Sequence, residues 1–143
     1  MTEPAEQQVI QFGQFIKTLA SRYLWMEIDL AGGITDLGKS ELLVIELMAW
    51  NDCHTTSQVA RAGKMPLSSA SWLIDRLVER GYVARQRSQA DRRVVELSLT
   101  PRGEETVAHL DRAFESMARD LLAIATEEER AALLAVAGRL ETG

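Results

Sequence analysis

Apolar residues recur at three- and four-residue steps along most of the chain, and this spacing predicts a mainly helical protein. Such steps place apolar side chains on one face of an α-helix. A long amphipathic helix is expected over about residues 7–30, a second over 38–50 and a short third one over 55–62. Between the first two, residues 31–36 have the composition of a turn.

Local signals refine the second and third of these helices. Thr55 and Gln58 have the spacing of a capping box, in which a hydroxyl and a side-chain amide satisfy free N–H groups of the first turn. In the second helix Leu43, Leu47 and Trp50 share one side. We expect that side to be buried, because the apolar stripe of an amphipathic helix faces the core.

Residues 66–100 predict one further helix that leads directly into a two-stranded hairpin. Gly81 is expected to end the helix, because glycine adopts the left-handed conformation at no steric cost. Alternating apolar and polar residues then predict strands that begin at Val83 and cover 94–99. The buried face of the helix is expected to consist of Ala70, Leu73, Ile74 and Leu77. The tip of the hairpin is expected to carry Asp91, Arg92 and Arg93.

The third helix and the helix that follows Pro66 are joined by only residues 63–65, which include a glycine. Two helices joined by such a tight turn form a helix-turn-helix unit. A helix with a small polar face fits the major groove of duplex DNA, and a basic hairpin tip is attracted to the narrow groove beside it. Binding of double-stranded DNA is therefore the first hypothesis.

Two more helices are expected after the hairpin. Thr100 and Pro101 form a helix start with a hydroxyl cap, and Thr126 and Glu129 repeat the capping-box spacing. The first helix and the last two have apolar faces broader than one packed neighbour would need. We therefore expect two chains to pack as a homodimer, whose twofold symmetry would place two recognition helices about one helical turn apart on a palindromic site.

Charge is distributed unevenly over the 143 residues, of which 46% are hydrophobic and whose net charge is −5. Residues 61–102 contain nine basic and four acidic side chains, so this segment carries +5 and the remainder −10. A basic module on an acidic body would be oriented on a polyanion, because the acidic part is repelled. The length and the hydrophobic content predict one domain with a substantial core.

Composition also argues against several classes of function. One cysteine and two histidines leave no disulfide framework and no plausible metal site, and we expect no cofactor. No phosphate-binding glycine loop, Ser-His-Asp group or acid pair at a strand end is present, so we expect no enzymatic activity. Without an apolar run of about 20 residues or a signal peptide, the protein is expected in the cytoplasm and not in a membrane.

Several motifs stand in register between residues 37 and 105. They are Leu37-x-x-x-Glu41-x-x-x-Ile45, the helix-turn-helix, Leu73-Ile74-Asp75-Arg76-Leu77-x-x-Arg80-Gly81-Tyr82-Val83-x-Arg85, Asp91-Arg92-Arg93 and Leu99-Thr100-x-x-Gly103. In order and spacing they resemble the MarR family of winged helix-turn-helix transcriptional regulators, and the flanking helices fit the dimerisation arms of that family. Several motifs in register are more specific than one short pattern.

The resemblance implies a mainly α fold with a small antiparallel β wing. Within a single domain of residues 1–143, a winged helix-turn-helix module would occupy 35–103, and dimerisation helices would occupy 1–34 and 104–143. It also implies a homodimer that binds palindromic promoter DNA, usually as a repressor, and that is often released by a small aromatic or phenolic molecule.

The resemblance also assigns roles to individual residues. Arg93 is expected to enter the minor groove, held by Asp91, with Arg92 beside it on the DNA backbone. On the recognition helix, Trp72 replaces a residue that is often polar or basic, so it is expected to read an apolar group such as a thymine methyl. The remaining candidates for DNA contact are Ser68, Ser69, Ser71, Arg76, Lys64, Arg85 and Arg87.

Alternatives remain open for some of these residues. Arg76 could pair with Asp75 or Glu79 on the helix surface instead of a phosphate. Cys53 beside His54 allows an oxidation-sensing regulator, because a nearby imidazolium lowers the pKa of a thiol. A winged-helix module that binds protein without specific DNA binding is a third class, although its wing would be neutral or acidic. The family suggests an effector pocket lined by Tyr23, Trp25, Met26, Met48, Trp50 and His54.

Overall fold

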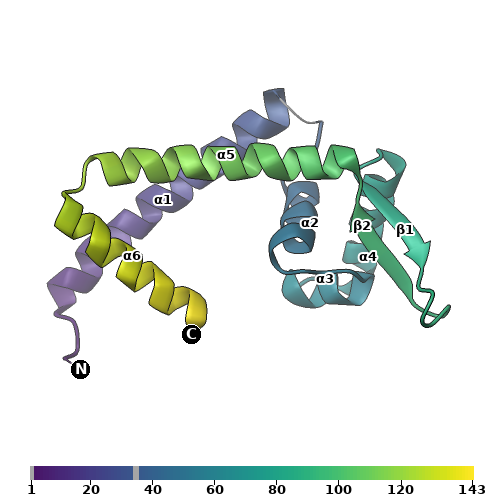
Figure 1. Ribbon diagram of the computed structural model, residues 1–143, viewed down its shortest axis with the longest axis horizontal. Helices are drawn as coiled ribbons and strands as arrows, with labels where there is room; N and C mark the ends of the chain where they lie inside the picture. The colour runs from purple at the N-terminus through teal and green to yellow at the C-terminus, as the bar shows by residue number, and fades with distance from the viewer. Residues whose placement is uncertain (1, 34–35) are drawn as a thin grey trace. The chain divides into compact units, whose positions relative to one another are not determined.

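A computed structural model describes residues 2–33 and 36–143, and it describes the side chains of these residues except those of 24–33. The described residues form six helices and one two-stranded antiparallel sheet, as predicted (Figure 1). The elements are α1 (Glu6–Gly33), α2 (Lys39–Trp50), α3 (Thr56–Ala62), α4 (Leu67–Glu79), β1 (Val83–Arg87), β2 (Val95–Leu99), α5 (Pro101–Ala123) and α6 (Glu127–Thr142). The chain divides into two compact units, Met1–Val107 and Ala108–Gly143, and the boundary between them falls within α5.

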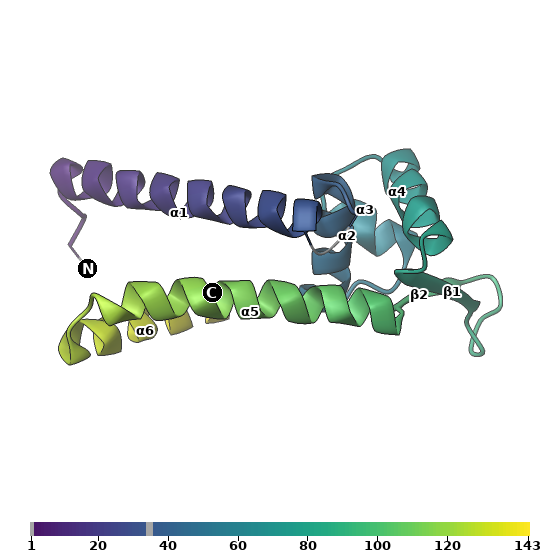
Figure 2. The ribbon, with the colours of Figure 1, turned by 90° about the horizontal axis from the view of Figure 1, so that it is seen from above.

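Helix α2 is the centre of the first unit. Figure 2 shows α2 beside α3 and α4, and α2 also contacts β2. Leu42, Val44 and Ile45 are fully buried, so nearly every side of α2 faces the core. The prediction of a single buried side was therefore wrong for Leu43 and Trp50, which are 37% and 45% exposed. A helix enclosed by neighbours loses the periodicity from which a buried side can be read.

The helix-turn-helix forms as the sequence predicts. Thr55 and Gln58 make both hydrogen bonds of the capping box at the start of α3. In the turn after α3, Lys64 has a φ of 50°, and the Met65 N–H donates to the Ala60 carbonyl at 3.0 Å. Helix α4 then buries Ala70, Leu73, Ile74 and Leu77, the face expected to pack. Gly81 has a φ of 82°, the left-handed conformation predicted for it.

The wing consists of β1, β2 and the connecting loop 88–94. Val83 pairs with Leu99 and Arg87 with Val95, so the second strand begins one residue later than expected. Val94 lies in the loop, where its carbonyl accepts from the Ser88 N–H at 2.9 Å. Leu97 is buried, and its N–H donates to the His54 carbonyl at 2.6 Å, which ties the wing to the segment before α3.

The ends of the longer helices follow the capping signals with one exception. Thr100 caps α5 by accepting a hydrogen bond from the Gly103 N–H at 3.2 Å, and Thr126 and Glu129 form the capping box of α6. Helix α1, however, continues through Gly33, so 31–33 are helical rather than part of a turn. Glycine weakens a helix interior by about 1 kcal/mol but does not forbid it, least of all in a last turn. Residues 34 and 35 of the expected turn lie outside the described residues.

A search of the described helices finds none with the length and hydropathy that a membrane span requires.

Gly103 explains one of the sequence motifs and yields a stability test. A β-carbon at Gly103 would lie 2.3 Å from the Tyr82 carbonyl oxygen, whereas one at Gly138 in α6 would have nothing within 4 Å. We expect Gly103→Ala to lower the free energy of unfolding by about 1–3 kcal/mol, the usual cost of overpacking. The matched Gly138→Ala should raise it by about 1 kcal/mol through helix propensity. Urea unfolding at one fixed protein concentration measures both, and equal effects would contradict this reading of Gly103.

Candidate DNA-binding surface

The outward face of α4 carries the predicted recognition residues. Ser68, Ser69 and Trp72 are exposed, and Ser71 is half-buried. An open hollow of about 400 Å³ lies along this face and is lined by Ser40, Ser68, Ser69, Trp72 and Leu73. The structure therefore brings the small hydroxyls and the indole together on one accessible side of the helix.

Arg76 on the same helix forms an ion pair within the protein. Its Nε donates to Oε1 of Glu41 at 3.0 Å, and Arg80 Nη1 donates to Oε2 of the same carboxylate at 3.2 Å. Glu41 is only 6% exposed, so Arg76 of α4 and Arg80, the residue directly after α4, compensate one buried charge on α2. The guanidinium carbon of Arg76 also lies 4.8 Å from the centre of the Trp72 ring.

The partners suggested for Arg76 from the sequence, Asp75 and Glu79, were wrong. Those residues are close along the helix, whereas Glu41 is brought close only by packing of α4 on α2. Asp75 instead forms an ion pair with Arg85 of β1, which ties the base of the wing to α4. Within β1 and the loop, Arg87 Nη1 donates to the Arg92 carbonyl at 3.0 Å.

The tip of the wing has the arrangement expected from the motif. Arg93 Nε donates to Asp91 Oδ1 at 3.1 Å and its Nη2 donates to Oδ2 at 3.3 Å. The Arg93 backbone N–H also donates to Oδ1, at 3.1 Å. The Arg93 side chain is nevertheless 91% exposed, so it is fixed in direction and free to make contacts. The Asp91–Arg93 hydrogen bonds expected from the motif are thus present, and their role in orienting the wing on DNA stays a prediction.

These hydrogen bonds from Arg93 lower the pKa of the Asp91 carboxyl. The side chain of Arg93 is the largest cause, and its backbone N–H is the next. Asp91 is therefore ionised throughout the neutral range and acts only as an acceptor.

A second network, which the sequence alone did not reveal, joins the end of α4 to its surroundings. Tyr82 Oη donates to Asp36 Oδ1 at 2.8 Å, and Arg80 Nη1 donates to the Asp36 carbonyl at 2.8 Å. Arg102 lies over the Tyr82 ring at 4.3 Å and donates to the Arg80 carbonyl at 2.6 Å. The Tyr82 hydrogen bond lowers the pKa of Asp36, while burial raises the pKa of Tyr82. Arg80 and Tyr82, together with Glu41, which Arg80 also binds, belong to the sequence motifs given above. Those motifs were the only indication of this network in the sequence.

Comparison with known proteins agrees with this geometry. A model described as the MarR family matches residues 34–94. Streptococcus pneumoniae FabT in complex with DNA is 25% identical, with 96% of each chain covered and a TM-score of 0.74. Over residues 34–94 the chain therefore resembles the MarR family.

Two further solved structures share the fold. A MarR family protein from Bacillus stearothermophilus is 17% identical, covers 98% of this chain and 97% of its own, and has a TM-score of 0.78. A mutant of S. aureus MepR bound to an oligodeoxyribonucleotide is 17% identical, covers 92% and 96%, and has a TM-score of 0.66. No curated protein sequence matches this chain.

The residues proposed for an effector pocket are in different environments. Tyr23 Oη lies 2.9 and 2.8 Å from the two carboxylate oxygens of the buried Glu46. Met48 is buried, whereas Trp50 is exposed and the exposed His54 pairs with Asp52 at 2.9 Å. The side chains of Trp25 and Met26 lie outside the described residues. Pocket roles for these six residues stay predictions.

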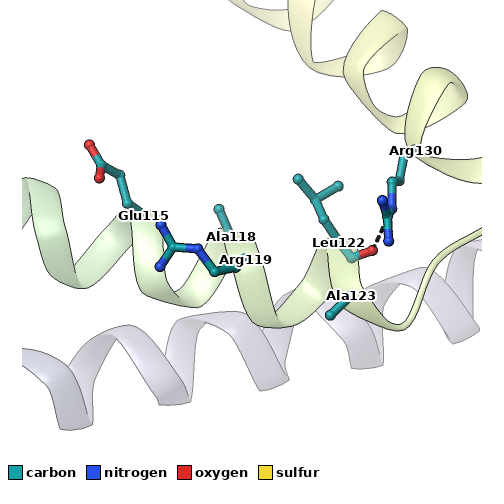
Figure 3. A pocket seen from close by; sticks show the side chains of 6 residues that line it. All are labelled: Glu115, Ala118, Arg119, Leu122, Ala123 and Arg130. Atoms are coloured by element: carbon teal, nitrogen blue, oxygen red, sulfur yellow. Dashed lines mark hydrogen bonds between the residues drawn. The ribbon is translucent and has the colours of Figure 1, made fainter. Parts of the chain in front are cut away.

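The second unit contains a hollow of about 540 Å³ at the turn between α5 and α6. Figure 3 shows the six residues that line it and the hydrogen bond from Arg130 Nε to the Leu122 carbonyl, 2.7 Å long. This bond satisfies a free carbonyl at the end of α5, which gives Arg130 a structural role. The lining residues are Glu115, Ala118, Arg119, Leu122, Ala123 and Arg130, none of which was predicted to bind an effector.

Cys53 does not have the environment of a redox sensor. The thiol is only 4% exposed, and burial followed by the charge of Asp52 raises its pKa. His54, whose charge was expected to lower that pKa, is paired with Asp52 instead. Because the thiolate is the reactive form, these surroundings disfavour the oxidation-sensing alternative.

The Asp91–Arg93 pair generates a pH prediction. We expect Arg93→Ala to raise the pKa of Asp91, measured by carbon NMR of the carboxyl, because the largest cause of its lowering is removed. A lowered folded-state pKa means that the pairing is complete above the range of an ordinary aspartate and is lost as pH falls through the lowered pKa. Arg92→Ala is the matched control and should leave the titration of Asp91 unchanged. An equal shift in both variants would contradict the assignment.

Proposed function

We propose that the protein is a homodimeric repressor that binds a palindromic DNA operator. The observation that carries the proposal is the Arg93 side chain, which is exposed at the wing tip and hydrogen-bonded to Asp91. A guanidinium fixed in this way is suited to a narrow minor groove, whose negative potential attracts arginine. Arg92, next to it and exposed, is suited to the adjacent phosphates.

Helix α4 would occupy the major groove in the same complex. Its exposed serines, Ser68 and Ser69, can donate to or accept from base edges, and Ser71 is half-buried beside them. Lys64 in the turn before α4, together with Arg85 and Arg87 of β1, is exposed and would add contacts to the DNA backbone. The DNA complex of S. pneumoniae FabT supports this use of the fold.

Dimerisation through the terminal helices is part of the proposal. In α1, Val9, Ile10, Phe12 and Ile16 are each more than half exposed, and in α6 so are Leu134, Val136 and Leu140. Rows of exposed apolar side chains of this size are unusual on a monomer surface, and a second chain would cover them. Sedimentation tests this part: a species of 15.9 kDa at micromolar concentration would refute the dimer.

Release of the operator by a small aromatic or phenolic molecule completes the proposal and rests on the family. Binding of such a molecule to the native state would raise its thermal stability by mass action. Thermal unfolding against a panel of aromatic acids tests for this. No stabilisation by any member would favour a regulator that acts without an effector.

The decisive experiment selects fragments of genomic DNA with the purified protein and sequences them. We expect a palindrome whose half-sites are centred about one helical turn apart, 10–10.5 base pairs, because twofold symmetry of the protein imposes that spacing. Arg93→Ala should weaken binding to this site by about 1–3 kcal/mol and lower the salt dependence of binding. Arg139→Ala in α6 removes the same charge far from the wing sequence and is the matched control.

Fluorescence anisotropy over a range of salt concentrations would measure both variants. Failure to select any sequence over random DNA would refute the proposed function. Equal weakening by Arg93→Ala and Arg139→Ala would show that only net charge matters, and it would contradict the role given to the wing tip.

A further inference from the structure

Trp72 is a large apolar side chain that is left 58% exposed in the middle of α4. It lies four residues after Ser68 and four before Arg76, so the three side chains follow one another along the same side of the helix. Exposure of an indole to water is unfavourable, and exposed apolar groups of this size mark surfaces that bind something. The inference that follows rests on the proposed function.

Arg76 holds this indole in place. Its guanidinium lies 4.8 Å from the ring centre, and its Nε is fixed by the buried carboxylate of Glu41 at 3.0 Å. Because Arg80 binds the other oxygen of that carboxylate, Glu41 is itself held at a fixed position. One face of the indole is thus covered by a clamped cation, and its edge and other face remain available for contact.

The charge of Arg76 is compensated by the same contact. A guanidinium paired with a buried carboxylate adds little net positive charge to the surface, and pulling it away would leave Glu41 with one partner fewer. This disfavours Arg76 as a phosphate anchor. We therefore assign it as a positioning residue for Trp72.

We propose that Trp72 reads the C5-methyl group of a thymine in the major groove of the operator. In that groove the thymine methyl is the apolar group among base edges that otherwise present hydrogen-bond donors and acceptors. The carbon edge of an indole can bury a methyl but carries no group that donates to a base acceptor or accepts from a base donor, because the one polar group of the ring, its N–H, lies elsewhere on the ring. Stacking on an unpaired base is disfavoured, because a helix in a groove and a wing beside it read an intact duplex.

The residues beside Trp72 fit the same base. Ser68 and Ser69 line the hollow next to the indole, and a serine hydroxyl can donate to the O4 acceptor that a thymine presents next to its methyl. The hydroxyls alone would accept several bases, because a hydroxyl both donates and accepts. Trp72 would therefore supply the discrimination at this position.

Substitution of uracil for thymine tests the proposal, because uracil lacks only the methyl. Each thymine of the selected operator is replaced by uracil together with its symmetry mate, and affinities are measured by anisotropy at one salt concentration. We expect one symmetry-related pair to lower the affinity of the wild-type protein by about fourfold per methyl, the effect of burying one methylene-sized group. In Trp72→Gln the ratio of thymine to uracil affinity at that pair should fall to about one.

Arg76→Lys and Glu79→Gln separate positioning from charge. Arg76→Lys keeps the positive charge and loses the planar group over the indole, so we expect a smaller thymine-to-uracil ratio at the same pair. Glu79→Gln changes an exposed residue of the same helix and should keep the wild-type ratio. Thermal unfolding of each variant confirms that it is folded, which the exposure of Trp72 favours for Trp72→Gln.

The outcomes distinguish this proposal from the function on which it rests. Selective operator binding with no thymine sensitive to uracil would overturn the methyl contact and leave the regulator intact. A sensitive thymine whose ratio is unchanged in Trp72→Gln would assign the methyl contact to another residue and overturn the role of Trp72. Binding without preference over scrambled DNA would overturn the proposed function and, with it, this inference.

Discussion

The orientation of α4 depends on the two hydrogen bonds that Arg76 and Arg80 donate to the buried carboxylate of Glu41. An ionised carboxylate in a protein interior is tolerated only where its charge is balanced and its oxygens accept hydrogen bonds. Here Arg76 of α4 and Arg80, the residue directly after α4, bind one oxygen each. These two contacts, about one helical turn apart, restrict the rotation of α4 about its axis and its sliding along α2. Apolar packing through Leu73 and Leu77 alone would restrict both movements less.

The same logic extends from α4 to the wing. Asp75 and Arg85 join the helix to the base of β1, and Asp91 directs Arg93 at the tip. Surface ion pairs of this kind contribute little to stability, because water screens them. They matter because they fix side-chain conformations before binding, so less conformational entropy is lost when a partner binds. Several basic side chains of the basic segment are therefore held in fixed positions by acidic partners. At those positions their positive charge is largely compensated.

Two sets of exposed apolar side chains among the described residues call for different explanations. Rows along α1 and α6 suit a second copy of the chain, since symmetric association buries identical faces together. Trp72 is a single indole among serines, with a cation fixed over one face. Its surroundings are polar, as those of a base-reading residue must be, because most groups on base edges are donors or acceptors.

The sequence by itself determined most features whose cause is local, although the composition of 31–33 predicted a turn where α1 continues. Such features depend on residues a few positions apart. The capping boxes at Thr55 and Thr126 and the left-handed conformation of Gly81 appear as predicted. The Asp91–Arg93 pair was predictable for the same reason, since it spans two residues. Contacts between residues distant in sequence were decided by tertiary packing alone. Glu41 reaches Arg76 across 35 positions, Asp36 reaches Tyr82 across 46, and the enclosure of α2 removed the periodicity that would have shown which side is buried. Burial likewise set the chemistry of Cys53, because desolvation in the folded protein is the largest cause of the raised pKa of its thiol and the charge of Asp52 is only the second.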